Sequence, residues 1–125
     1  MQKVAASPDE NSIANTLVLL GNVYQDFGDH SRAIDLYKQA AVIFERILRA
    51  DSPILAELFY NLGIVQSRCD ALADAQSNLE RSVLIYRRLW AKGHPDRVAA
   101  ENELRRVVQL RPKNMNESVL LKSNN

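Results

Sequence analysis

Apolar residues recur every three or four positions along most of the chain, which is the spacing that lines one face of an α-helix. Four such series occur: Ile13, Leu17, Leu20 and Tyr24; Ala33, Tyr37, Ala40, Phe44 and Leu48; Leu55, Leu58, Leu62 and Val65; and Leu72, Ala75, Leu79, Val83, Tyr86 and Trp90. No segment alternates between apolar and polar residues for the length of a strand. The pattern therefore predicts an all-α chain.

The ends of the predicted helices carry their own signals. A capping side chain followed by proline at the first helical position occurs three times, at Ser7-Pro8, Ser52-Pro53 and His94-Pro95. The segment 28–30 separates the first two helices, and Gly93 is expected to end a helix in the left-handed conformation. Pro112 ends the last helix. The predicted helices are residues 8–27, 31–50, 53–69, 72–92 and 95–110.

A repeat of 42 residues relates the two halves of the chain. Small residues align with small ones and large apolar residues mostly with large ones, as in the pairs Gly21 and Gly63, Ala33 and Ala75, and Leu20 and Leu62. We interpret residues 1–111 as one helical repeat domain, with repeats near 12–53 and 54–95 and a capping helix near 95–110. The polar segment 112–125 is predicted to be a disordered tail.

The repeat resembles the tetratricopeptide repeat, in the 42-residue form found in kinesin light chains. The matching residues are Leu17, Leu20, Gly21, Tyr24, Gly28, Ala33, Tyr37 and Ala40 in the first repeat, Phe59, Leu62, Gly63, Ala75 and Leu79 in the second, and Val98 and Leu104 in the last helix. The resemblance implies an α-α superhelix of stacked helical hairpins, with about two and a half repeats and five helices. The second repeat departs from the pattern at Gln66, Asp70 and Ser82.

In arrays of this family, the first helix of each pair lines a concave groove that binds other proteins. The resemblance thus implies partner-binding positions at Asn15, Val18, Asn22, Gln25, Asp26, Glu57, Tyr60, Asn61, Ile64, Arg68, Asn102, Glu103, Arg106 and Gln109. Amides in such a groove can donate to and accept from an extended peptide backbone. Asn22 and Asn61 fall where the carboxylate-clamp subfamily has its asparagines, but Val18, Ala99 and Glu103 stand in place of the basic residues that the clamp needs.

Composition and charge argue against several other functions. The net charge is +1, which gives no electrostatic reason to bind nucleic acid or an anionic membrane. No apolar stretch is long enough to span a bilayer, and Cys69 has no second cysteine to pair with, so we expect a cytoplasmic protein. Glycine-rich phosphate loops and hydrolase motifs are absent, and we expect no enzymatic activity, no cofactor and no metal site.

Three functions stay open at this point. The first is a scaffold or adaptor that binds a peptide or a helix of a protein partner in the groove. The second is a self-associating or capping fragment of a larger repeat assembly, because the first helix is apolar almost all round and leaves Val18 and Leu19 to find cover. The third is an RNA-associated repeat, which rests on the C-terminal arginines alone, including Arg105 and Arg111.

Overall fold

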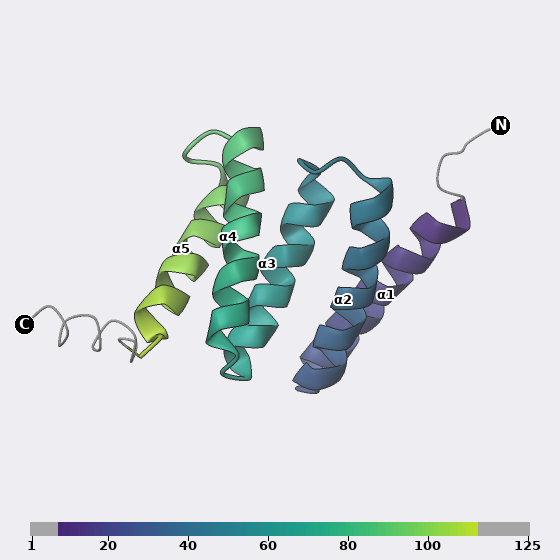
Figure 1. Cartoon of the computed structure of the whole chain (residues 1–125), viewed down its shortest axis with the longest axis horizontal. Coiled ribbons are helices and arrows are strands. Elements are labelled where there is room, and N and C mark those ends of the chain that lie inside the picture. Colours follow the sequence, from purple (N-terminus) through teal and green to yellow (C-terminus); the bar gives the residue numbers. More distant parts are fainter. Residues whose placement is uncertain (1–7, 113–125) are drawn as a thin grey trace, which may run out of the picture.

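The computed structural model describes residues 8–112, and these form five α-helices (Figure 1). The helices are α1 (Pro8–Asp26), α2 (His30–Ile47), α3 (Pro53–Arg68), α4 (Leu72–Leu89) and α5 (Pro95–Leu110). No strand occurs between residues 8 and 112, so the predicted all-α class with five helices is confirmed. The Ser7 cap and the predicted tail beyond residue 112 lie outside the described residues.

The described cap-and-proline signals work as predicted. Ser52 Oγ accepts a hydrogen bond from the backbone N–H of Ile54 at 3.2 Å, at the start of α3. His94 Nδ1 accepts one from the backbone N–H of Asp96 at 3.2 Å, at the start of α5. In both cases a side chain satisfies one of the N–H groups that the first helical turn leaves without a partner.

Two helix ends differ from the prediction. The second helix ends at Ile47 and the fourth at Leu89, each about one turn early, because Leu48 and Trp90 adopt extended backbone conformations. The expectation for Gly93 was wrong, since α4 has already ended and the positive φ values among residues 8–112 belong to Gly28 and Asp70, at 83° and 63°. Aspartate is one of the few residues with a side chain that tolerates this conformation.

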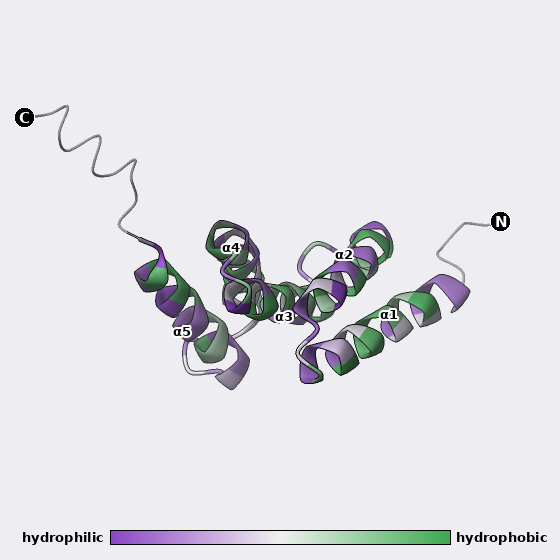
Figure 2. Cartoon of the chain, turned by 90° about the horizontal axis from the view of Figure 1, so that it is seen from below, coloured by the Kyte–Doolittle hydropathy of each residue, from purple (hydrophilic) through white to green (hydrophobic). Residues whose placement is uncertain are grey.

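The helices form two layers. The first helices α1, α3 and α5 lie in one layer, and the second helices α2 and α4 lie in the other (Figure 2). Along the stack α2 packs on both α1 and α3, and α4 packs on both α3 and α5. A middle helix such as α3 is therefore covered on two sides.

Small residues set the spacing within each hairpin. A Cβ atom on Gly21 would lie 2.6 Å from Cε1 of Tyr37, and one on Gly63 would lie 2.6 Å from Cγ of Leu79. Both distances are too short for non-bonded carbon atoms. The helices thus approach closely where the repeat pattern has glycine.

Two departures from the repeat pattern are explained by hydrogen bonds within the second hairpin. The hydroxyl of Ser82 donates to the backbone carbonyl of Ala56 at 2.7 Å, so the buried oxygen is satisfied. The buried Gln66 accepts a hydrogen bond from Nδ2 of Asn78 at 2.8 Å. These bonds cross from α3 to α4 and give both buried side chains a hydrogen-bond partner.

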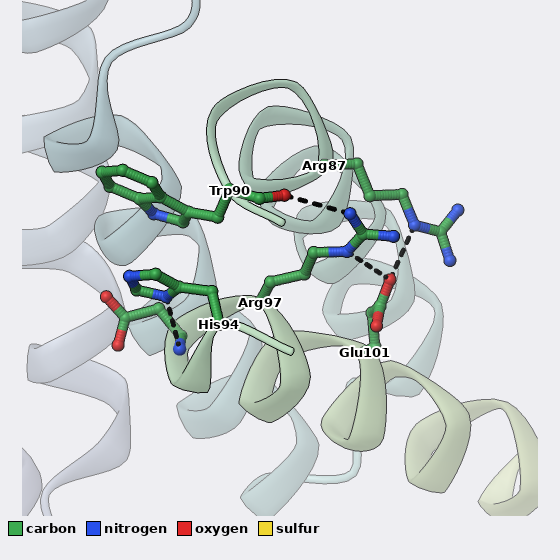
Figure 3. Close-up of polar contacts among 6 residues, drawn as sticks. Arg87, Trp90, His94, Arg97 and Glu101 are labelled. Atoms are coloured by element: carbon green, nitrogen blue, oxygen red, sulfur yellow. Dashed lines mark hydrogen bonds and ion pairs between the residues drawn. The ribbon is translucent and has the colours of Figure 1, made fainter. Parts of the chain in front are cut away.

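The C-terminal end of the stack is held by polar contacts (Figure 3). The rings of Trp90 and His94 stack with centroids 4.5 Å apart. Glu101 accepts hydrogen bonds from Nε of Arg87 at 2.8 Å and from Nε of Arg97 at 3.1 Å. The bond from Arg87 is the main reason that the pKa of Glu101 is lowered, and Arg97 adds to it. The carboxylate on α5 is therefore held in its charged form.

A leucine at position 75 tests the packing register. Ala75 is fully buried, whereas Ala73 on the same helix is exposed. We expect Ala75→Leu to lower the free energy of unfolding by about 1–3 kcal/mol, because the added carbons have no room. Ala73→Leu, the matched control, should change it by less than about 0.5 kcal/mol. Urea unfolding followed by circular dichroism measures both, and equal stabilities would mean that the register is wrong.

Candidate functional site

The predicted partner-binding residues all lie on the first helices α1, α3 and α5, and the surface that they form is here called the first-helix face. Exposed on it are Asn15, Asp26, Glu57, Arg68, Asn102, Arg106 and Gln109, and half-buried are Val18, Asn22, Gln25, Tyr60, Asn61, Ile64 and Glu103. Positions one repeat apart, such as Val18 and Tyr60, occupy corresponding places on neighbouring helices. Their role in binding stays a prediction.

At the α1 end, two amides of this face are anchored to the core. The hydroxyl of Tyr37, a fully buried residue of α2, lies 2.5 Å from Oδ1 of Asn22 and 2.8 Å from Oε1 of Gln25. Burial, and secondarily the charge of Asp26, raise the pKa of Tyr37 to about 12, so the hydroxyl keeps its proton, and the two amide oxygens share this single donor. The core therefore fixes the oxygen end of both amides.

The nitrogen ends of the same two amides are the part that a partner can use. Neither the Asn22 nor the Gln25 amide nitrogen donates to another residue in the range 8–112. The two residues are three positions apart, so they lie on one face within a single helical turn. Together they present hydrogen-bond donors whose position is set by a buried tyrosine, which suits carbonyl oxygens of a bound backbone.

At the α3–α5 end, the face is tied together by Arg106. Its Nη2 donates to Oγ of Ser67 at 3.1 Å and its guanidinium also forms an ion pair with Glu103. Tyr60 is half-buried beside these groups, and its pKa is raised mainly by desolvation and further by the charges of Glu103 and Asp96. This end offers an aromatic ring with a phenol that stays protonated at neutral pH.

The charges on the first-helix face have both signs. Asp26, Glu57 and Glu103 are acidic, whereas Arg68 and Arg106 are basic. Val18, at one position where a carboxylate clamp needs a cation, instead packs against the hydrophobic core. The face therefore lacks the concentrated positive charge that would select an acidic tail, and its chemistry suits a partner segment of mixed polarity.

A second candidate site lies on the side of the second helices and was not predicted. It is a hollow of about 240 Å³ lined by Glu45, Ala50, Leu55, Phe59, Arg81, Leu84, Ile85 and Arg88. The guanidinium of Arg81 lies 3.9 Å above the ring of Phe59 and is also bonded to Glu45. The signal available in the sequence was Leu84, an apolar residue outside the helical series of its segment, which is exposed here.

Between residues 8 and 112, the side chains of His, Cys, Asp and Glu nowhere gather in threes with a geometry that could hold a metal ion. Over the same range, none of the helices combines the length and apolar character needed to cross a bilayer. The arrangement can bind by hydrogen bonds and apolar contact.

Comparisons with known proteins agree with this geometry. The tetratricopeptide repeat family model matches residues 12–88. The chain is similar to a crystal structure from Podosopora anserina that contains nearly identical TPR-like repeats of a kinesin light chain. The TM-score is 0.68 and the sequence identity is 25%, and the match covers 89% of this chain and 53% of that one. A variant of that protein gives a TM-score of 0.68 at 24% identity, over 90% and 53% of the two chains, and supports the fold alone. The chain thus spans about half the length of these solved structures. No curated protein matches it.

The two asparagines of the first-helix face should differ in their effect on stability. Asn22→Ala removes one of the two acceptors of the buried Tyr37 hydroxyl, and we expect it to lower the free energy of unfolding by about 1 kcal/mol. Asn61 bonds no other residue in the described part of the chain, so Asn61→Ala should cost less than about 0.5 kcal/mol. Chemical denaturation measures both. If the two variants were equally stable, the tyrosine contact would contribute nothing.

Proposed function

Because the chain belongs to the tetratricopeptide repeat family, a family of protein-interaction repeats, we propose that it is an adaptor whose first-helix face binds an extended peptide segment or a helix of a partner. The observation that carries the proposal is the pair of amides at Asn22 and Gln25, whose oxygens are held by the buried Tyr37 and whose nitrogens are left as donors. A binding surface needs such groups to be positioned before the partner arrives.

The rest of the face supplies selectivity under this proposal. Asn61 adds another amide on α3, and Tyr60 and Ile64 offer half-buried apolar contact beside it. Hydrogen bonds to the backbone of a peptide do not depend on its sequence. The ring of Tyr60 and the opposite charges of Glu57 and Arg68, in contrast, favour particular side chains of the partner. The partner is then a segment that combines an apolar residue with charges of both signs.

Two further predictions concern the cellular location and the RNA alternative. The single exposed thiol of Cys69 is consistent with a reducing compartment such as the cytoplasm, which we propose as the location. The arginines behind the RNA alternative are each bonded within the chain, Arg105 to Asn102 and Arg111 to Gln76. No observation favours RNA as the ligand.

A peptide selection tests the proposed face. Peptides selected from a random phage-displayed library on the immobilised chain would be synthesised and titrated by calorimetry against variants. We expect Gln25→Ala and Asn61→Ala each to weaken binding by about fivefold, the equivalent of one net hydrogen bond of about 1 kcal/mol. Gln39→Ala, an exposed amide on α2, is the matched control and should leave the affinity unchanged.

The same titrations identify a wrong assignment. Arg88 lines the hollow on the second-helix side and bonds no other residue between 8 and 112. If Arg88→Ala abolished binding while Gln25→Ala and Asn61→Ala had no effect, the ligand would bind in that hollow and the proposal for the first-helix face would be wrong.

A further inference from the structure

One side of α1 is apolar and open. Ile13, Leu20 and Val23 are exposed by 51%, 42% and 47%, and with the exposed Thr16 they follow one another at steps of three and four residues. A shallow hollow of about 410 Å³ lies at the start of this stripe, lined by Asp9, Ser12, Ile13, Thr16 and Leu17. We call the stripe of Ile13, Thr16, Leu20 and Val23 the open face.

The chain itself shows what covers such a face. One repeat later, the corresponding residues of α3 are Leu55, Leu58, Leu62 and Val65, and they are exposed by only 2%, 2%, 3% and 0%. They are distinct from the α3 residues that meet α4, where Gly63 approaches Leu79. Since α3 also packs on α2, the second helix of the preceding hairpin covers this stripe.

The helix α5, which is the first helix of the third repeat unit, follows the same rule. Of the four corresponding positions of α5, Ala100 and Val107 are fully buried, Leu104 is half-buried, and the first is the half-buried Arg97. The helix that packs on α5 is α4, which is again the second helix of the preceding hairpin. Two of the three first helices thus have this cover, and α1 has the same apolar stripe without it.

The opposite end of the stack is built differently. The α5 residue that corresponds to the buried Phe59 is Glu101, whose carboxylate is held by Arg87 and Arg97 (Figure 3). Where α3 has Gly63, α5 has the exposed Arg105. The C-terminal end therefore combines the charged Glu101 and Arg105 with the exposed Val98 and Val108. The open face of α1 has no charged residue among its four positions.

We propose that the open face of α1 binds an amphipathic helix of the α2 type, supplied by a protein partner and lying antiparallel to α1. Its apolar side would pack on the open face as α2 packs on the corresponding stripe of α3. Charge indicates its direction: α1 has acidic residues in its first turn, including the exposed Asp9, whereas α2 and α4 have arginines in their last turns. An antiparallel helix with a basic last turn places its cations beside Asp9.

A second copy of the chain fits this face less well. Two α1 helices that pair antiparallel bring Asp9 of one copy near Asp26 of the other, and two that pair in parallel bring the acidic first turns together. Like charges at both ends oppose either arrangement. The second helices of another copy are already packed between their own neighbours. These helices could therefore cover α1 of the first copy only if their own copy unfolded.

The chain provides its own probe. A labelled synthetic peptide of residues 30–49 has the sequence of the helix that covers α3, and its binding to the full chain can be followed by fluorescence anisotropy. We expect saturable binding that Val23→Asp weakens at least tenfold, because it places a charge in an apolar contact. Asp9→Lys should also weaken binding, and an Arg46→Glu change in the peptide should weaken binding to the parent chain.

Controls separate this site from the others. Leu84→Asp introduces the same charge at an exposed apolar position on α4 and should leave the affinity unchanged. Asn61→Ala should have no effect either, so that failure of the first-helix face and failure of this proposal are distinguishable. Absence of saturable binding, or binding that survives Val23→Asp, would overturn the proposal. So would sedimentation velocity that showed a dimer of the chain abolished by Val23→Asp, because the occupant would then be a second copy.

Discussion

The structure depends on one packing constraint, which is that a first helix of this repeat has two apolar sides and its own hairpin covers only one. In α3 both sides are covered, by α4 within the hairpin and by α2 from the hairpin before. In α5 the side toward the preceding hairpin is covered by α4, and the other side carries Glu101, which is paired with two arginines. In α1 the side that would face a preceding hairpin is apolar and exposed at Ile13, Leu20 and Val23. The three first helices thus differ in which of their two sides is covered within the described residues.

The same packing prepares the proposed binding surface. Gly21 lets the ring of Tyr37 lie directly against α1, and this close approach brings the tyrosine hydroxyl to Asn22 and Gln25. The second hairpin keeps the glycine, at position 63, but has Leu79 in place of the tyrosine. The residue that corresponds to Asn22 is Ile64, and a leucine offers no hydroxyl to bond at this place. The amides held by the tyrosine therefore lie at the α1 end, whereas Tyr60 and Ile64 provide apolar contact on α3.

The fold could be predicted because its signals are local. Helical periodicity and the caps at Ser52 and His94 depend on residues within one or two turns, and the structure confirms them. The ends of α2 and α4 were predicted too late because Leu48 and Trp90 continue the apolar period after the backbone has left the helix. Periodicity records which side chains are buried, and an extended residue can be buried as well.

The surfaces were harder to predict, because they depend on several helices at once. Val18 was expected to need cover from outside, but it packs on the core, while Leu20, which was expected to be packed, is exposed. Both belong to the same helix turn, and only the position of α2 decides which of them is inside. The hollow around Phe59 and Arg81 joins α2, α3, α4 and the segment between α2 and α3, so no single segment of sequence signals it.

Each helix should be stabilised according to the number of neighbouring helices that pack on it. Native-state hydrogen exchange followed by mass spectrometry tests this directly, because amides in a less covered helix exchange through smaller openings. We expect α1, whose main neighbour within the described residues is α2 alone, to exchange faster than α3, with α2, α3 and α4 slower than α1 and α5. Equal protection of α1 and α3 would contradict it, since the open face would then cost the first helix nothing.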